Sequence, residues 1–334
     1  MLIDWRVAAG AAVFCAGVLL ACIETNAQGI PKEVAARVEM HTIPSLTLSD
    51  RQFLTGDTNG AQPVTMAGEF RIAQGIGRLP AVVLMHGSGG ISPAMEAWTR
   101  QLNSMGISTF VIDGFSGRGL TSVNQDQAKL GRLNFILDIY GALEILAKHP
   151  RVDPDRIVLM GFSRGGQGAL YASLKRFNDM WNRSGAQFAA YIPFYPDCAT
   201  TYAGDTDVVD RPIRIFHGTP DDYNPVASCK AFLARLEAEK RDVTLTEYPD
   251  SQHGFDAGLL GVSSNVVASG AQTVRNCRIT ESEGGVLVNA ETKEPFSYKD
   301  ACVEQNPHVG GNPATAQEAR KAVTDFLQAL FKLS

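Results

Sequence analysis

Short apolar runs alternate with longer segments of helical periodicity from about residue 80 to the end of the chain. The apolar runs cover residues 79–87, 107–114, 156–162, 188–196, 212–218 and 243–249. The helical segments cover residues 92–106, 125–150, 165–177, 224–240 and 314–332. This alternation is typical of βαβ units, in which helices cover both faces of a parallel sheet. The sequence therefore predicts an α/β fold with a mainly parallel central sheet.

Two regions depart from the alternation. Residues 45–54 and 62–72 have alternating polarity and are predicted to add antiparallel strands at one edge of the sheet. Residues 256–312 are rich in Gly, Asn and Ser and lie between the last strand and the last helix. Because a long segment of this kind is usually functional or braced, we expect a surface insertion, with residues 278–296 forming a hairpin. Residues 28–334 are then expected to form a single domain.

The N-terminus has the layout of a secretory signal peptide. Arg6 precedes an apolar segment of small residues, and Thr25 and Ala27 are the small residues before a predicted cleavage at Gln28. Residues 1–27 are thus expected to be removed from an exported protein, periplasmic or secreted. An alternative reading treats residues 19–22 as a lipoprotein box, and only lipidation of Cys22 would attach the protein to a membrane. An uncleaved anchor is less favoured because the apolar run is short for a membrane span.

The composition limits which partners the protein can bind and indicates the redox state of its cysteines. The chain has 334 residues, 45% of them hydrophobic and 19% charged, with a net charge of −5. No basic stripe indicates nucleic acid as a partner. Outside the signal peptide, four cysteines remain in a chain expected in an oxidising compartment. We favour the pairs Cys198–Cys229 and Cys277–Cys302 among the three pairings because each falls within its own segment. With no CxxC or HExxH motif, we predict no metal.

One serine lies in a GxSxG sequence. Gly161-Phe162-Ser163-Arg164-Gly165 follows a predicted strand and opens a predicted helix. At such a turn, glycines two residues before and after leave room for a nucleophile to face the carboxyl edge of the sheet. A similar sequence around Ser116 lacks the second glycine. The pattern therefore indicates Ser163 as the nucleophile.

A serine nucleophile needs a base and an orienting acid, which in this architecture follow in the order Ser, Asp, His. Asp221 and Asp222 lie in the loop after the strand at 212–218, and His253 lies in the loop after the strand at 243–249. The three loops lie at the same edge of a parallel sheet, so these side chains can converge. In the alternative reading, Ser163 caps a helix, the aspartate stabilises a turn and His253 is a surface histidine.

The oxyanion of an acyl-transfer reaction needs backbone N–H donors. The loop His86-Gly87-Ser88-Gly89-Gly90 follows the first central strand, where such a donor is expected. We favour the N–H of Ser88, with Gly87 or Gly89 as alternatives, together with the N–H of Arg164 after the nucleophile. His86 is expected to anchor this loop.

Residues near the same sheet edge are candidates for substrate binding. Arg118 and Arg164 could hold a substrate carboxylate, or each could pair with an acid such as Asp113 and fix the loops. Phe115 and Tyr223, with other aromatic residues of the post-strand loops, could line an apolar pocket or simply pack.

Taken together, the motifs HGSGG, DGFSGRG, GFSRGG, HGTPDD and YPDSQHGF resemble those of the dienelactone hydrolase family of the α/β-hydrolase superfamily. The resemblance covers about residues 60 to 256 and the last helix. It implies hydrolysis of small esters or lactones without a metal or organic cofactor. Carried over, it implies Ser163 as nucleophile, His253 as base and Asp221 as acid, because the family pattern HGxxDxxxP is in register with Pro225.

The chain departs from that family in three respects. The namesake enzymes use a cysteine nucleophile where this chain has a serine, and the signal peptide and the insertion are further differences. We therefore expect a serine esterase acting on a carboxylic ester or lactone. The alternatives are a peptidase of the prolyl-oligopeptidase type and a catalytically silent binding protein. Transfer of the acyl group to an alcohol and the oligomeric state are left open.

Overall fold

The computed structural model describes residues 31–261 and 265–333. The predicted signal peptide at 1–27, with Cys22 and the alternative lipidation site, lies outside the described residues. Within the described part of the chain, no helix combines the length and apolar character needed to cross a bilayer.

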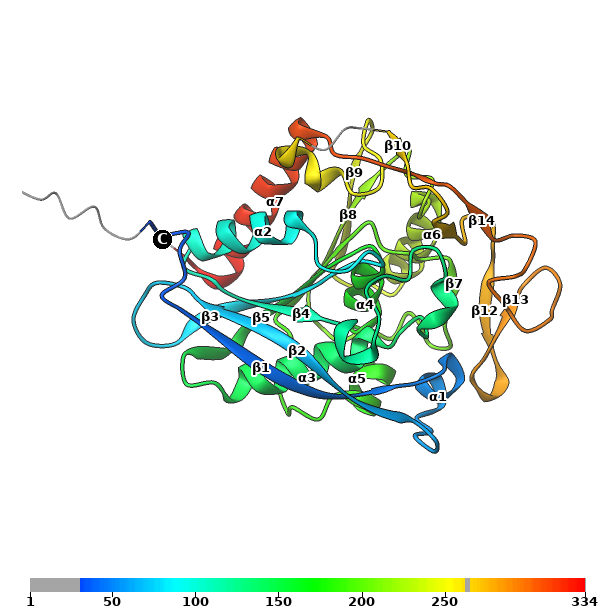
Figure 1. Ribbon diagram of the computed structural model, residues 1–334, viewed down its shortest axis with the longest axis horizontal. Helices are drawn as coiled ribbons and strands as arrows, with labels where there is room; N and C mark the ends of the chain where they lie inside the picture. Colours follow the sequence, from blue (N-terminus) through cyan, green and yellow to red (C-terminus); the bar gives the residue numbers. More distant parts are fainter. Residues whose placement is uncertain (1–30, 262–264, 334) are drawn as a thin grey trace, which may run out of the picture. The chain divides into compact units, whose positions relative to one another are not determined.

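A sheet of eight strands forms the centre of the described structure (Figure 1). In spatial order the strands are β1 (Arg37–Thr47), β2 (Gln62–Ile72), β4 (Ser108–Asp113), β3 (Leu79–Met85), β5 (Val152–Phe162), β6 (Ala190–Phe194), β8 (Ile213–Gly218) and β9 (Val243–Tyr248). The pairs β1–β2 and β2–β4 are antiparallel, and every other pair in this sheet is parallel. The predicted fold, a mainly parallel sheet with an antiparallel edge, is confirmed.

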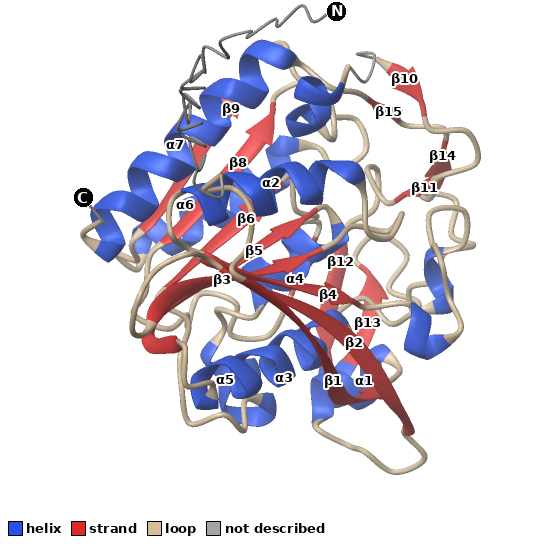
Figure 2. Cartoon of the chain, turned by 60° about the vertical axis from the view of Figure 1, so that its left-hand side comes forward, coloured by secondary structure: helices blue, strands red, loops and turns tan. Residues whose placement is uncertain are grey.

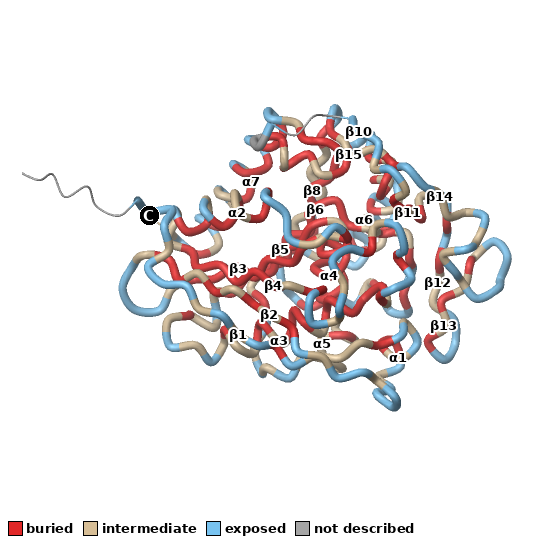
Figure 3. Tube along the Cα trace, viewed as in Figure 1, coloured by how far each residue is buried: buried red, intermediate tan, exposed pale blue. Residues whose placement is uncertain are grey.

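Helices pack on both faces of the sheet (Figure 2). They are α1 (Asp50–Thr55), α2 (Pro93–Ser104), α3 (Phe135–Lys148), α4 (Arg164–Tyr171), α5 (Lys175–Trp181), α6 (Val226–Ala238) and α7 (Pro313–Phe331). Successive side chains of a strand point to opposite faces. In β3, Val83 packs in the cluster that contains α3, whereas Val82 and Leu84 pack in the cluster that contains Trp98 of α2 and Val323 of α7. The central strands are therefore buried on both sides (Figure 3).

Two predicted elements differ from the observed ones. Residues 45–54 do not form one strand, because β1 ends at Thr47 and a capping box between Ser49 and Gln52 begins α1. The helix predicted at 125–150 begins only at Phe135. Before it lie a short 3-10 turn, η2 (Gln127–Lys129), and a loop whose backbone bonds to distant side chains, including a 2.6 Å bond from the N–H of Arg132 to Asp50. Tertiary contacts thus replace helical hydrogen bonds in that loop.

The segment before the last helix is built from short strand pairs. β10 (Val266–Val267) pairs with β15 (His308–Val309), and β11 (Gln272–Thr273) pairs with β14 (Glu304–Gln305). The predicted hairpin is confirmed as β12 (Ile279–Ser282) and β13 (Val286–Asn289), with β7 (Thr200–Thr201) parallel to β12. The segment also contains two 3-10 helices, η3 (Phe255–Leu260) and η4 (Glu283–Gly285).

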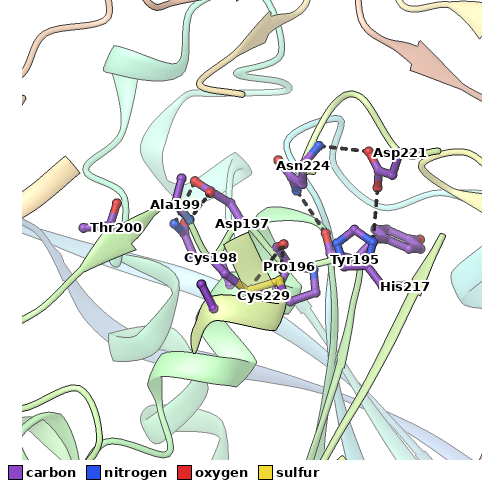
Figure 4. Close-up of a disulfide and its surroundings, with 12 residues drawn as sticks. Tyr195, Pro196, Asp197, Cys198, Ala199, Thr200, His217, Asp221, Asn224 and Cys229 are labelled. Carbon is purple, nitrogen blue, oxygen red and sulfur yellow. Dashed lines mark hydrogen bonds and ion pairs between the residues drawn. A yellow bond between two sulfur atoms is a disulfide. The ribbon is translucent and has the colours of Figure 1, made fainter. Parts of the chain in front are cut away.

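Both predicted disulfides are present. Cys277–Cys302 closes a loop within the insertion. Cys198–Cys229 connects the loop after β6 to α6 and is buried (Figure 4). The second disulfide therefore fixes the loop that begins at Tyr195, at the carboxyl end of the central strand β6.

Candidate active site

Ser163 lies on a sharp turn between β5 and α4. Its backbone φ of 55° and ψ of −117° are unusual for a residue other than glycine. A Cβ on Gly161 would lie 2.0 Å from the carbonyl oxygen of Gly165, and a Cβ on Gly165 would lie 2.2 Å from the carbonyl oxygen of Met85. Only glycine fits at these two positions, so the GxSxG sequence makes this strained turn sterically feasible.

The hydroxyl of Ser163 begins a chain of hydrogen bonds across three loops. Its Oγ lies 2.8 Å from Nε2 of His253, and Nδ1 of His253 lies 2.8 Å from Oδ2 of Asp221. These residues follow β5, β9 and β8 respectively. Because the Asp221 carboxylate accepts a hydrogen bond from the Nδ1–H group, Nε2 is the nitrogen free to accept the serine proton. The structure therefore brings together the three residues expected from the sequence.

The Asp221 side chain is fully buried and held by its own turn. Oδ1 accepts hydrogen bonds from the backbone N–H groups of Tyr223 at 2.8 Å and Asn224 at 2.9 Å. The side-chain amide of Asn224 in turn donates to the carbonyl oxygen of Tyr195 at 2.9 Å (Figure 4). The carboxylate is thus aimed at His253 by contacts that satisfy its other oxygen.

Two tyrosine rings hold the imidazole of His253. The ring centroids of Tyr195 and Tyr223 each lie 4.6 Å from that of His253. The hydroxyl of Tyr195 donates to Asp256 at 2.6 Å, and Nε1 of Trp98 donates to the same buried carboxylate at 2.9 Å. Burial, together with the neighbouring Asp256, raises the pKa of Tyr195 well above its usual value. Tyr195 therefore acts as a neutral, fixed wall behind the imidazole.

Asp222, the alternative acid, serves a different set of contacts. Its carboxylate accepts from the backbone N–H of His308 at 2.6 Å and lies 2.9 Å from the His308 ring and 2.8 Å from the Arg275 guanidinium. Partial burial acts to raise the pKa of Asp222, but the hydrogen bonds from His308 and the nearby cations hold it below the usual range. Asp222 therefore connects the insertion to the Asp221 turn.

The two backbone N–H groups expected to bind an oxyanion lie near Ser163 and have no acceptors in the described part of the chain. Among the described residues, neither the N–H of Ser88 nor that of Arg164 has a hydrogen-bond partner, and the N–H of Gly89, an alternative donor, has none either. The Ser88 loop lies against the nucleophile, since a Cβ on Gly87 would be 3.1 Å from the Cβ of Ser163. Unpaired N–H groups at this place suit a developing oxyanion.

His86 anchors that loop, as expected. Nε2 accepts a 3.0 Å hydrogen bond from the N–H of Gly114, and Nδ1 donates to the carbonyl oxygen of Gly87 at 2.8 Å. The ring packs on Phe115 and Phe135. Burial lowers the pKa of His86 to about 4, so the imidazole is neutral at physiological pH.

A narrow pocket opens beside Ser163. Its lining includes Ser88, Arg164 and Tyr223 from the residues expected to take part, and nine more: Gln127, Arg132, Gln167, Asp197, Asn224, Gln272, Thr273, Val274 and Tyr298. Tyr223 is thus placed as expected. No sequence pattern indicates Arg132, which lies inside the helix predicted at 125–150. Asp197, a polar residue directly after a strand, was detectable in principle and was missed.

Arg118 and Phe115 are not among the residues that line this pocket. Both nitrogens at the end of the Arg118 side chain contact the buried carboxylate of Asp138, at 2.7 and 2.9 Å. Phe115 is buried against His86, under the loop of residues 86–90, called the oxyanion loop below. Of the two alternatives for these residues, the geometry favours structural roles: Arg118 fixes its loop through Asp138, not Asp113, and Phe115 packs in the core.

The Arg164 side chain also fixes a loop. Its guanidinium donates to the side chain and backbone carbonyl of Gln127 and to the carbonyls of Leu130 and Gly131, at 2.9 to 3.3 Å. Gln127 in turn accepts from the Ser88 hydroxyl at 3.1 Å. The acceptors of this guanidinium are all neutral. The side-chain amide of Gln127 connects Arg164 to Ser88, the two residues expected to supply N–H donors for an oxyanion.

Within the described ranges, one group of side chains converges as metal ligands do: Glu39, His41 and His149. Nε2 of each imidazole lies 3.1 to 3.2 Å from the same carboxylate oxygen of Glu39. Nδ1 of His149 accepts from the N–H of Arg151 at 3.2 Å, which assigns the proton to Nε2. The trio is thus satisfied as a carboxylate bound by two imidazoles. His149 lies just before β5, whereas Ser163 follows the other end of that strand.

Comparisons with known proteins agree with this architecture. The family model described as the dienelactone hydrolase family matches residues 67–273. A solved structure named m3DLH is 17% identical, with a TM-score of 0.55 over 87% of this chain and 98% of that chain. A dienelactone hydrolase-like promiscuous phosphotriesterase from metagenomic libraries is 17% identical, with a TM-score of 0.51 over 88% of this chain and 98% of that chain.

A carboxylesterase from Lactobacillus plantarum is 16% identical, with a TM-score of 0.48 over 66% of this chain and 85% of that chain. Among curated protein sequences, none matches the chain.

Proposed function

The chain belongs to the dienelactone hydrolase family and is a hydrolase, and from this premise we propose that it cleaves carboxylic esters or lactones with Ser163 as the nucleophile. The observation that carries the proposal is the pair of 2.8 Å hydrogen bonds that connect Ser163, His253 and Asp221. A nucleophile, base and orienting acid in this geometry perform acyl transfer on unrelated folds.

The reaction begins when Oγ of Ser163 attacks the carbonyl carbon while its proton passes to Nε2 of His253. The N–H groups of Ser88 and Arg164 donate to the oxyanion of the tetrahedral intermediate. The C–O bond to the leaving group then breaks, and His253 gives the proton to the departing alkoxide. In a lactone, the leaving hydroxyl stays attached to the acyl group.

Water completes the cycle by the same route. His253 takes a proton from a water molecule while the water oxygen attacks the acyl-enzyme. His253 then returns that proton to Oγ of Ser163 as the carboxylic acid leaves. Asp221 keeps His253 in the tautomer that presents Nε2 and stabilises the imidazolium formed in each half-reaction. The chemistry requires no electron acceptor and no metal.

The proposed place of action is outside the cytoplasm. Two disulfides, one of them buried, suit an oxidising compartment, and the predicted signal peptide at 1–27 would deliver the protein there. Small esters or lactones are the proposed substrates, since the pocket beside Ser163 is narrow.

Labelling with a fluorophosphonate tests the proposal directly, because such a probe reacts with activated serines. Intact mass and peptide mapping should find one adduct, on Ser163, that is lost in Ser163→Ala and His253→Ala. Ser116→Ala provides the matched control, since Ser116 lies in the similar GFS sequence and its variant should label like the wild type. Release of acid from simple esters should follow the same pattern.

An adduct on another serine, or none on folded protein, would refute this assignment and favour the silent binding protein. Cleavage of peptide amides at rates near those of esters would favour the peptidase alternative.

A further inference from the structure

Residues with polar side chains make up most of the lining of the pocket beside Ser163. Ligand pockets are mostly lined by apolar and aromatic side chains, with few polar groups. Here Val274 is the one aliphatic side chain among the residues that line the pocket, and most of the others carry amide, hydroxyl, carboxylate or guanidinium groups. The lining therefore favours a ligand that forms hydrogen bonds.

A buried ion pair forms part of this lining. The guanidinium of Arg132 contacts the carboxylate of Asp197, and its Nη1 donates to the hydroxyl of Tyr298 at 2.7 Å. The Arg132 side chain is 2% exposed and the Asp197 side chain 13%. The other carboxylate oxygen of Asp197 accepts from the N–H of Ala199 at 2.8 Å. The pair presents a donor and an acceptor side by side with no net charge.

Two donors of the lining are left without acceptors among the described residues. Nε of Arg132 is buried and has no hydrogen-bond partner. Gln272 uses its carbonyl oxygen to accept from the N–H of Gln127 at 2.9 Å, and no acceptor is recorded for its amide nitrogen. A ligand oxygen that reaches the Gln272 amide supplies the acceptor that this donor lacks.

The charges and hydrogen-bonding groups exclude two classes of acyl group. An alkyl chain would cover the polar lining without replacing its contacts with water, which is unfavourable. A carboxylate would meet the Asp197 carboxylate, while the Arg132 cation beside it is already paired. The N–H groups of the Arg164 guanidinium, the other cation of the lining, already have acceptors in Gln127, Leu130 and Gly131. A hydroxyl group can both donate to the Asp197 carboxylate and accept from the side-chain amide of Gln272, which also lines the pocket.

We propose that this pocket is an acyl-binding subsite selective for small, uncharged acyl groups that carry a hydroxyl, with Arg132 and Asp197 as the residues that determine specificity. The proposal rests on the ester hydrolysis proposed above and names its substrate class: esters of hydroxy acids or hydroxylated lactones.

The insertion supplies one wall of this subsite. Gln272, Thr273, Val274 and Tyr298 all come from residues 256–312. The segment is anchored close to the catalytic groups, because the N–H of Gly310 donates to the carbonyl oxygen of His253 at 2.9 Å and Thr273 donates to that of Tyr223 at 2.6 Å. The insertion therefore shapes the acyl subsite as well as covering it.

Three methyl esters of similar size test the proposal: methyl butyrate, methyl 3-hydroxybutyrate and monomethyl succinate. Acid release is followed in a pH-stat, and each kcat/KM is divided by the rate of base-catalysed hydrolysis of that ester. The wild type should prefer the hydroxylated ester over butyrate by at least ~10-fold, since a site built to hydrogen-bond a hydroxyl rejects the analogue that lacks it. Monomethyl succinate should be the poorest substrate.

Asp197→Asn should lower kcat/KM for the hydroxylated ester and raise that for monomethyl succinate, because the Arg132 cation is then unpaired. Asp205→Asn is the matched control. Asp205 forms an ion pair with Arg235, and its carboxylate is also buried. Because Asp205 does not line the pocket, Asp205→Asn should keep the wild-type preference among the three esters. A Ser163-dependent preference for butyrate or succinate in the wild type would overturn the subsite while leaving the proposed function standing. Absence of hydrolysis and of Ser163 labelling would overturn both.

Discussion

Acidification should destabilise this protein through His86, the anchor of the oxyanion loop. The side chain is 1% exposed, and Nε2 accepts from the N–H of Gly114, a bond that a protonated imidazole cannot accept. Burial lowers the pKa of His86 from 6.5 to about 4. At a pH between these two pKa values, His86 is protonated in the unfolded chain but not in the folded protein. The free energy of unfolding therefore falls as the pH falls from 6.5 to 4, and this contribution is constant outside that window.

The magnitude follows from the gap between the two pKa values. At ~1.4 kcal/mol for each pH unit, the gap corresponds to about 3 kcal/mol of stability present above pH 6.5 and absent below pH 4. His86→Gln keeps a donor and an acceptor but does not titrate. The difference in free energy of unfolding between wild type and His86→Gln should therefore shrink by about 3 kcal/mol from pH 7 to pH 4. Burial also lowers the pKa of His217, but both proteins contain that residue and the difference removes it.

Denaturant unfolding at a series of pH values measures this difference, provided that both proteins unfold in two states. A difference that does not change between pH 7 and pH 4 would refute the reasoning. If His86→Gln does not fold, titration of the His86 imidazole by NMR in the wild type decides the same question, and a pKa near 6.5 would refute it.

Three further predictions concern the acid, the oxyanion loop and the insertion. Asp221→Asn should lower kcat for ester hydrolysis by roughly 10⁴-fold, whereas Asp222→Asn should stay within a few-fold of wild type; equal losses in steady-state assays would contradict the assignment. Gly87→Ala should lower kcat by roughly 10- to 100-fold, because its Cβ would lie 3.1 Å from the nucleophile side chain; an unchanged kcat would be incompatible with this contact. Replacing both Cys277 and Cys302, which are 25 residues apart, by serine should lower the free energy of unfolding by roughly 3–4 kcal/mol in denaturant titrations, and no loss would mean that the insertion contributes nothing to global stability.

The arrangement of the sheet was predictable because its strands are buried on both faces. Strands in this position have continuous apolar runs that differ clearly from the 3.6-residue period of helices. The convergence of Ser163, His253 and Asp221 followed from the same pattern, since each residue directly follows a strand of a parallel sheet. Steric restriction of the turn made the glycines around Ser163 a second, independent signal.

The sequence could not reveal partners that meet only after folding. Arg118 pairs with Asp138, which lies within the predicted helix and gave no signal of its own. Arg132 was hidden in the same predicted helix, because helical periodicity does not register that tertiary hydrogen bonds have replaced helical ones. Tyr298 reaches Arg132 from the insertion, 166 residues away. The proposed specificity residues thus depend on contacts with no local pattern, whereas the proposed catalytic residues depend on elements that have one.

The two adjacent aspartates show how closely the catalytic and specificity elements are connected. The Asp221 carboxylate faces His253, and the Asp222 carboxylate binds His308 and Arg275 of the insertion. Consecutive residues in a tight turn point in different directions. The turn at residues 221–222 can therefore orient the proposed base through Asp221 and hold the insertion, which forms one wall of the proposed acyl pocket, through Asp222. A displacement of the insertion would therefore change both the alignment of the acid and the shape of the subsite. The insertion is for this reason part of the active site, not an addition to its rim.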